Sequence, residues 1–140
     1  MLHRPVHSTT LIAKRSELSS SIIPRSQTRT MASNPARYKL VFFSPLPNLA
    51  DIKTAVFATG AGTYPNYSEC CFTTPGVGQF RPGDSANPTI GAKGQLEEVG
   101  EARCEMVCNG REITEKAVAA LKKAHPYEEP AYEVYKLEDF

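Results

Sequence analysis

The densest group of ionisable side chains lies in residues 125–129, where His125 and Tyr127 are followed by Glu128 and Glu129. A histidine beside carboxylates could hold a divalent metal ion or transfer a proton. A structural interpretation is also open, because a histidine at the C-terminal end of a helix interacts favourably with the helix dipole, and the two prolines of this segment would shape a turn. The segment is thus a candidate site, with His125, Glu128 and Glu129 as candidate metal ligands.

A second candidate is the loop of residues 76–94, in which Arg81, Asn87 and Lys93 stand among several glycines. Backbone N–H groups freed by glycine, together with a cation, can hold an anion. The alternative is a packing loop whose glycines only satisfy turn geometry. Long loops in compact domains are usually functional, so we favour ligand binding here, with a small anionic ligand.

The four cysteines, Cys70, Cys71, Cys104 and Cys108, lack C-x-x-C spacing and suit a reducing compartment. Cys104 and Cys108 share one face of a predicted strand with Met106, which favours a place in the core over a metal site. The sequence contains no Walker motif, no serine with a His/Asp signature and no acidic pair placed for glycoside chemistry. Nothing in it specifies a nucleophile, and no cofactor is indicated beyond a divalent metal.

The elements that must position these residues follow the order β-α-β-β-α-β. Apolar and β-branched runs predict strands at residues 38–43, 67–74, 96–108 and 131–137. The first helix is predicted to follow Asn48 as its N-cap and to end at Gly60. The second follows the turn Asn109-Gly110 and stops before Pro126. This order predicts an α+β ferredoxin-like sandwich, an antiparallel sheet with two helices on one face.

The uncovered face of such a sheet needs an explanation. In residues 96–108, small apolar residues alternate with Glu101, Arg103 and Glu105, which indicates one wet face. Sheets of this kind often meet a copy of themselves, so we expect a homo-oligomer.

Composition narrows the class of protein. A chain of 140 residues that is 41% apolar can fold around one core, and it has no apolar run long enough to span a membrane. Residues 37–140 hold 11 basic and 14 acidic side chains. A mildly acidic domain argues against nucleic acid as a partner. We therefore expect a soluble domain at residues 37–140 that binds neither nucleic acid nor membrane.

Residues 1–36 differ in composition, with five basic residues against one acid and many serines and threonines. This composition is typical of a mitochondrial transit peptide, which would place the protein in the mitochondrial matrix. The alternative is that translation starts at Met31, which would leave the protein in the cytoplasm. In either case we expect the segment to be disordered, because it cannot build a core.

Three stretches together resemble a known family. They are Gly60-Ala61-Gly62 with the following Asn66-Tyr67-Ser68-Glu69-Cys70-Cys71-Phe72, then Gly78-Gln79-Phe80-Arg81-Pro82 with Ala86-Asn87-Pro88-Thr89-Ile90-Gly91, and finally His125-Pro126-Tyr127-Glu128-Glu129-Pro130-Ala131-Tyr132. They resemble the PII/CutA-like module of the NGG-interacting-factor family, also called GTP cyclohydrolase type 2-like. The resemblance covers nearly everything after Arg37, so the chain looks like a standalone form of the module. It departs from the family at Pro65, where glycine is usual, and at Cys71, where a small polar residue is usual.

The resemblance implies a PII/CutA-like fold. The third stretch also looks like the corresponding segment of CutA proteins, which are trimeric, so it implies a trimer-like assembly. Full-length family members carry a dimetal site in a flanking domain with no counterpart in these 140 residues, so hydrolase activity cannot simply be carried over. The matched turns and loops supply the candidate ligand-binding residues, which are Gly62, Tyr67, Arg81, Asn87, Gly91, Lys93, His125, Tyr127 and Glu128.

Our leading hypothesis is a non-catalytic regulatory or ligand-binding module that self-associates through its sheet. One alternative is a metal-dependent hydrolase of a nucleotide or similar small molecule, with His125 and Glu128 or Glu129 as ligands or base. Another is an interaction protein that docks onto a full-length family member.

Overall fold

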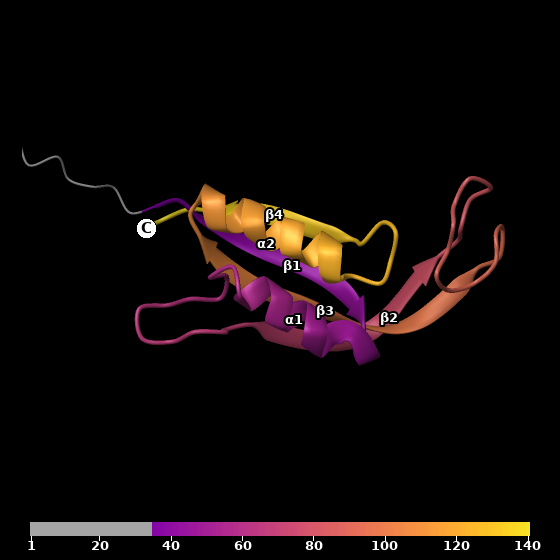
Figure 1. Cartoon of the computed structure of the whole chain (residues 1–140), viewed down its shortest axis with the longest axis horizontal. Helices are drawn as coiled ribbons and strands as arrows, with labels where there is room; N and C mark the ends of the chain where they lie inside the picture. Colours follow the sequence, from indigo (N-terminus) through magenta and orange to yellow (C-terminus); the bar gives the residue numbers. More distant parts are fainter. Residues whose placement is uncertain (1–34) are drawn as a thin grey trace, which may run out of the picture. The chain divides into compact units, whose positions relative to one another are not determined.

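A four-stranded antiparallel sheet in the order β2-β3-β1-β4 carries two helices on one face (Figure 1). The computed structural model describes residues 35–140, which belong to one compact unit. Its elements are β1 (Arg37–Pro45), the 3₁₀ turn η1 (Leu46–Asn48), α1 (Leu49–Phe57), β2 (Phe72–Phe80), β3 (Glu97–Asn109), α2 (Arg111–Ala124) and β4 (Tyr132–Leu137). The predicted ferredoxin-like α+β architecture is confirmed. The predicted transit segment lies almost wholly outside the described residues.

The core lies between the sheet and the helices. Alternate residues of β1, among them Leu40 and Phe42, are fully buried against Ile52 of α1 and Leu121 of α2. Strand β3 contributes the face that contains Cys104, as its alternating sequence predicts, and leaves its charged residues on the open face. Burying this apolar stripe from each element is the main source of stability. None of the described helices is long and apolar enough to cross a membrane.

The second strand is displaced along the chain from its predicted position, residues 67–74. Two backbone hydrogen bonds between Tyr64 and Tyr67 form a tight turn, and Glu69 has a positive φ of 57°, which interrupts an extended chain. The strand therefore begins at Phe72 and continues through Pro75 to Phe80. Proline and glycine are tolerated there because β2 is an edge strand and needs backbone partners on one side only.

The start of α1 also differs from its prediction. Asn48 immediately precedes the helix but forms no side-chain capping hydrogen bond. It is the last residue of the 3₁₀ turn η1 and has helical backbone angles, whereas a capping asparagine is normally extended. Asp51 remains in the first turn, where its charge suits the helix dipole.

Strands β2 and β3 extend beyond the two helices and form an arm, defined here as residues 76–101, with residues 81–96 as its terminal loop. In Figure 1 the arm curves upward beside the turn that follows α2, residues 125–131. That turn, called the α2 turn below, and the arm contain the two segments in which the sequence predicts chemistry.

Candidate functional site

A cavity of about 630 Å³ lies between the arm and the α2 turn. Its size falls within the range of ordinary small-molecule sites. Its lining includes three aromatic residues and three acidic residues, namely Phe43, Phe80, Tyr127, Glu101, Glu128 and Glu129. The two segments singled out in the sequence thus form opposite walls of one site.

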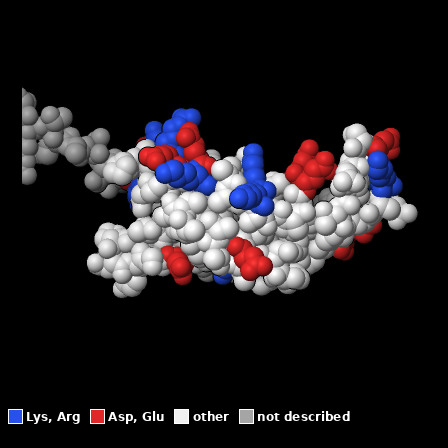
Figure 2. All heavy atoms as spheres, viewed as in Figure 1, with Lys and Arg blue, Asp and Glu red and all other residues white. Residues whose placement is uncertain are grey.

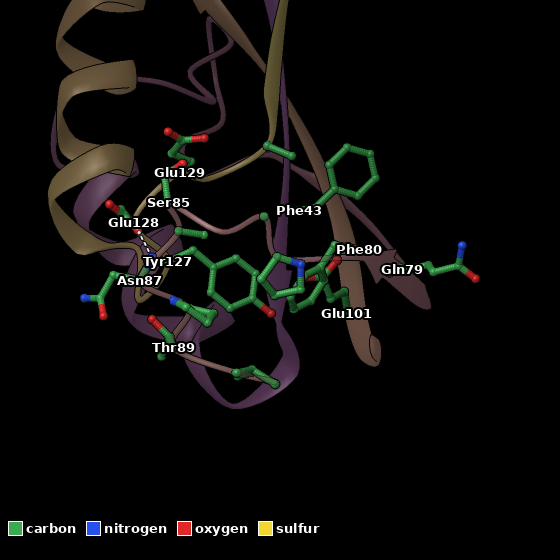
Figure 3. A pocket seen from close by; sticks show the side chains of 17 residues that line it. Phe43, Gln79, Phe80, Ser85, Asn87, Thr89, Glu101, Tyr127, Glu128 and Glu129 are labelled. Atoms are coloured by element: carbon green, nitrogen blue, oxygen red, sulfur yellow. Dashed lines mark hydrogen bonds between the residues drawn. The ribbon is translucent and has the colours of Figure 1, made fainter. Parts of the chain in front are cut away.

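Two hydrogen bonds join these walls. The backbone N–H of Asn87 donates to Glu128 Oε2 at 3.1 Å, drawn as a dashed line in Figure 3. The hydroxyl of Thr89 donates to the backbone carbonyl of Pro126 at 3.0 Å. The rings of Phe80 and Tyr127 add a tilted aromatic contact with centroids 6.3 Å apart. The arm loop is therefore attached to the body of the domain and does not simply project from it.

His125 lies behind the cavity and anchors the α2 turn. Its buried ring contacts two backbone groups, with Nε2 2.8 Å from the Phe43 carbonyl oxygen and Nδ1 accepting from the Tyr127 N–H at 3.1 Å. These partners assign the neutral tautomer with the proton on Nε2. Both ring nitrogens are thereby used, so neither is free for a metal ion.

The carboxylates beside His125 do not change that conclusion. Within residues 35–140, no group of three His, Cys, Asp or Glu side chains is placed to hold a metal ion. Glu128 and Glu129 face the cavity, whereas His125 faces the end of β1. The metal hypothesis for these three residues thus finds no support in their arrangement.

Tyr127 stands at the centre of the cavity lining (Figure 3). Its hydroxyl oxygen is sealed from solvent beside the Glu101 carboxylate. Burial, together with the nearby Glu101 carboxylate, raises the pKa of Tyr127 to about 12. The phenol therefore stays protonated near neutral pH.

Glu101 owes its position to a glycine on the neighbouring strand. A Cβ atom added at Gly78 would collide with the Glu101 carboxylate, so this side chain lies across the bare backbone of β2. Gly76, directly opposite Glu101 in the strand pairing, leaves further open space. Glu101 and Gly78 also border a second, smaller hollow along the open face of the sheet, where Arg103 lies.

The basic residues of the arm do not face the cavity. Arg81 donates to the backbone carbonyl of Gly94, and Lys93 Nζ donates to the carbonyl of Asp84 at 2.8 Å. Neither residue belongs to the lining, which contains no lysine, arginine or histidine. Figure 2 shows acidic atoms and no basic ones between the end of α2 and the tip of the arm. The expected grip on an anion is therefore not formed by these side chains, which instead hold the loop together.

The structure brings Asn87, Tyr127 and Glu128 together out of the candidate ligand-binding residues. Arg81, Gly91 and Lys93 lie in the arm loop outside the lining, and His125 lies behind it.

The other two candidates, Gly62 and Tyr67, lie in the loop after α1, beside the end of β3 that is remote from the arm. Gly62 has a positive φ of 71°, and a Cβ there would lie 2.7 Å from the Cys70 carbonyl oxygen. Glycine is needed at this position for packing.

The sequence did not single out Glu101, Phe43 or Phe80 as cavity residues. Glu101 fits the pattern of a strand with one wet face, and Phe43 ends a strand that reads as buried. Their shared position depends on the pairing of β2 with β3 and on the fold of the arm loop. The one local signal was the Gly-x-Gly at residues 76–78, where two side chains are missing from the same face of a strand.

Comparison with solved structures first defines the class of protein. The fold matches the divalent cation tolerance protein CutA from Archaeoglobus fulgidus with a TM-score of 0.54 at 15% identity, over 74% of this chain and 86% of that one. CutA from Xylella fastidiosa matches similarly, with a TM-score of 0.53 at 20% identity, over 74% of this chain and 86% of that one. Identities this low define the fold only. The chain is thus an α+β domain with the CutA-like fold.

Closer matches define the family. A Bacillus cereus protein related to NIF3 matches with a TM-score of 0.66 at 36% identity, over 76% of this chain and 27% of that one. The GTP cyclohydrolase 1 type 2 homologs of Halalkalibacterium halodurans and Bacillus subtilis are 46% identical over 101 residues and 35% identical over 125 residues. These alignments cover 71% and 87% of this chain.

No family model matches the chain. The matches to relatives and structures show that the chain is homologous to one part of the NIF3-related GTP cyclohydrolase 1 type 2 homologs. It spans about a quarter to a third of the length of the curated relatives it matches, at 27% and 33% for the two named above.

Proposed function

We propose that this chain is a ligand-binding module that holds a small molecule in the cavity between the arm and the α2 turn. The observation that carries the proposal is the construction of this cavity. Its walls come from segments about forty residues apart, they are joined by the Asn87–Glu128 and Thr89–Pro126 hydrogen bonds, and they bring aromatic rings and carboxylates together around one hollow. A concave site that combines aromatic rings with a few convergent polar groups is a common kind of ligand position.

The chemistry of the lining favours binding over catalysis. Its titratable side chains are Glu101, Glu128, Glu129 and Tyr127. A general acid or base works best with a pKa near the working pH, whereas that of Tyr127 is raised to about 12. No specific observation favours the alternative of a metal-dependent hydrolase, because the ring nitrogens of His125 are already used. A regulatory role would follow if ligand occupancy altered the contact between the arm and the body.

An NMR titration of the ¹⁵N-labelled chain tests the proposal. We would add adenosine, nicotinamide, agmatine and citrate separately and follow the backbone amide signals. At least one compound should shift the amides of Asn87 and Tyr127 and leave that of Gly62 unchanged. Tyr127→Ala should abolish the shifts, whereas Phe140→Ala, which removes an exposed ring outside the sheet, should preserve them. The proposal fails if no compound shifts the lining amides at millimolar concentration, or if the shifts centre on Gly62.

We also propose that the module self-associates through its sheet. Both edge strands, β2 and β4, have backbone groups without a partner on one side, and they carry exposed apolar residues, including Phe72 at 66% and Tyr135 at 53% exposure. Such edges are favourable places for another copy to pair. Native mass spectrometry should give a multiple of the 15.3 kDa chain mass. Phe72→Asp should reduce it to one chain, whereas a wild-type chain that is monomeric at micromolar concentration would refute the proposal.

A further inference from the structure

We infer that the cavity takes a small organic cation with N–H groups, and that Glu101 is the residue that selects for positive charge. This inference rests on the proposed ligand-binding function and names its ligand class. It is carried by the charges of the lining, by the aromatic walls and by the position of Glu101 over Gly78.

The first step is the charge of the lining. Three carboxylates, those of Glu101, Glu128 and Glu129, border one cavity that has no basic side chain in its lining. Glu128 already accepts the Asn87 N–H, and within residues 35–140 neither Glu101 nor Glu129 belongs to an ion pair. Nearby like charges repel one another, and a cation placed among them relieves this repulsion. The unbalanced negative charge therefore favours a positively charged occupant.

The second step is the shape and polarity of the walls. The rings of Phe43, Phe80 and Tyr127 line the same space as the carboxylates. The faces of aromatic rings attract cations and also pack against flat groups. A bare metal ion would leave this apolar surface unused, and no set of side chains in the described part of the chain is arranged to coordinate one. A flat organic cation, such as an amidinium on an aromatic ring, matches both features.

The third step is the position of Glu101. Its carboxylate lies across Gly78, near the hydroxyl of Tyr127. The two carboxylate oxygens of Glu101 are both acceptors, so two adjacent N–H groups of one ligand could bind this side chain. Hydrogen bonds between charged partners are the stronger kind, which makes Glu101 the main source of discrimination.

The test uses three probes of nearly the same shape and different charge, namely benzamidine, benzamide and benzoate. Dissociation constants would be measured by NMR titration of the full chain. Benzamidine should bind most tightly and benzoate most weakly. Glu101→Gln should weaken benzamidine binding by at least about tenfold and should change benzamide binding by less than about threefold.

Two further variants separate the position of the carboxylate from net charge. Gly78→Ala keeps Glu101 but forces its carboxylate off β2, so it should also weaken benzamidine binding. Gly78→Ala therefore still tests the role of the Glu101 carboxylate if the Glu101→Gln variant does not fold. Glu133→Gln removes one negative charge from an exposed residue on the same sheet face, outside the lining. It should leave the order of the three probes unchanged.

The outcomes distinguish this inference from the function on which it rests. If benzoate binds at the lining amides as tightly as benzamidine, or if Glu101→Gln and Gly78→Ala leave benzamidine binding unchanged, the cation inference is wrong and the ligand cavity stands. If adenosine or nicotinamide binds there and benzamidine does not, the same conclusion follows. If no probe from either series shifts the amides of Asn87 and Tyr127, both proposals fail.

Discussion

Replacing His125 with alanine should destabilise the domain by about 3 kcal/mol. The ring bridges two backbone groups, the Phe43 carbonyl at 2.8 Å and the Tyr127 N–H at 3.1 Å. Each such hydrogen bond contributes about 0.5–1.5 kcal/mol net, and a buried backbone group left without a partner costs about 1–3 kcal/mol. Urea unfolding followed by circular dichroism measures the loss. For a domain of about 100 residues, the melting temperature should fall by about 10–15 °C.

Two conservative variants divide this effect between the two bonds. His125→Gln can place a donor near the Nε2 position, and His125→Asn can place an acceptor near the Nδ1 position, so each should recover about half of the lost stability. Chelator treatment of the wild-type chain should leave its unfolding curve unchanged, because the ring holds backbone groups. The reasoning is refuted if the free energy of unfolding of His125→Ala lies within about 0.5 kcal/mol of the wild-type value. It is equally refuted if the chelator destabilises the wild-type chain as much as the alanine variant.

Three other predictions follow from the same structure. The pKa of Tyr127 is about 12 in the folded chain and about 10 in the unfolded chain, so the stability gained from its protonated form is complete below about pH 10 and is lost as the pH rises towards 12. Tyr127→Phe should flatten that decline in urea midpoints between about pH 10 and pH 12. Burial raises the pKa values of Cys104 and Cys108 to about 12 and about 11. Iodoacetamide should therefore label Cys70 and Cys71 first, which peptide mass spectrometry would detect. Comparable labelling of all four cysteines would contradict this prediction. Gly62→Ala should lower the free energy of unfolding by about 1–3 kcal/mol, because Gly62 has a positive φ and lies close to the Cys70 carbonyl. Gly83→Ala, with open space around it, should lower the free energy of unfolding by less than about 0.5 kcal/mol. Equal unfolding midpoints for the two variants would refute this prediction.

The architecture was predictable because its signals are local. The stripe of α2 that includes Ala117 and Leu121, and the alternation in β3 around Cys104, each report which side of an element is buried. The second strand was placed wrongly because its neighbours decide its limits. Pro75 reads as a strand breaker, but it is acceptable in an edge strand, and no local pattern reveals which strand lies at the edge.

The site was predictable as two segments but not as one cavity. The sequence singles out the arm loop and the α2 turn, and the structure brings Asn87 and Glu128 into contact across them. The sign of the charge was not predictable. Arg81 and Lys93 suggested an anion, yet both side chains donate to carbonyls of their own loop, and the charges that face the cavity include Glu101 from a strand face expected to be wet. Which way a long side chain points is set by tertiary contacts that spacing does not encode.

The two hydrogen bonds between the walls have a consequence for the order of assembly. They join residues 41 and 37 positions apart, across a stretch that includes β3 and α2. Contacts of such long range require the intervening elements to be in place, because closing a large loop costs entropy before any contact compensates it. We therefore expect the cavity to close late in folding. A chain that has collapsed around its helices without completing the arm would resemble the native state in its secondary structure and still lack the cavity.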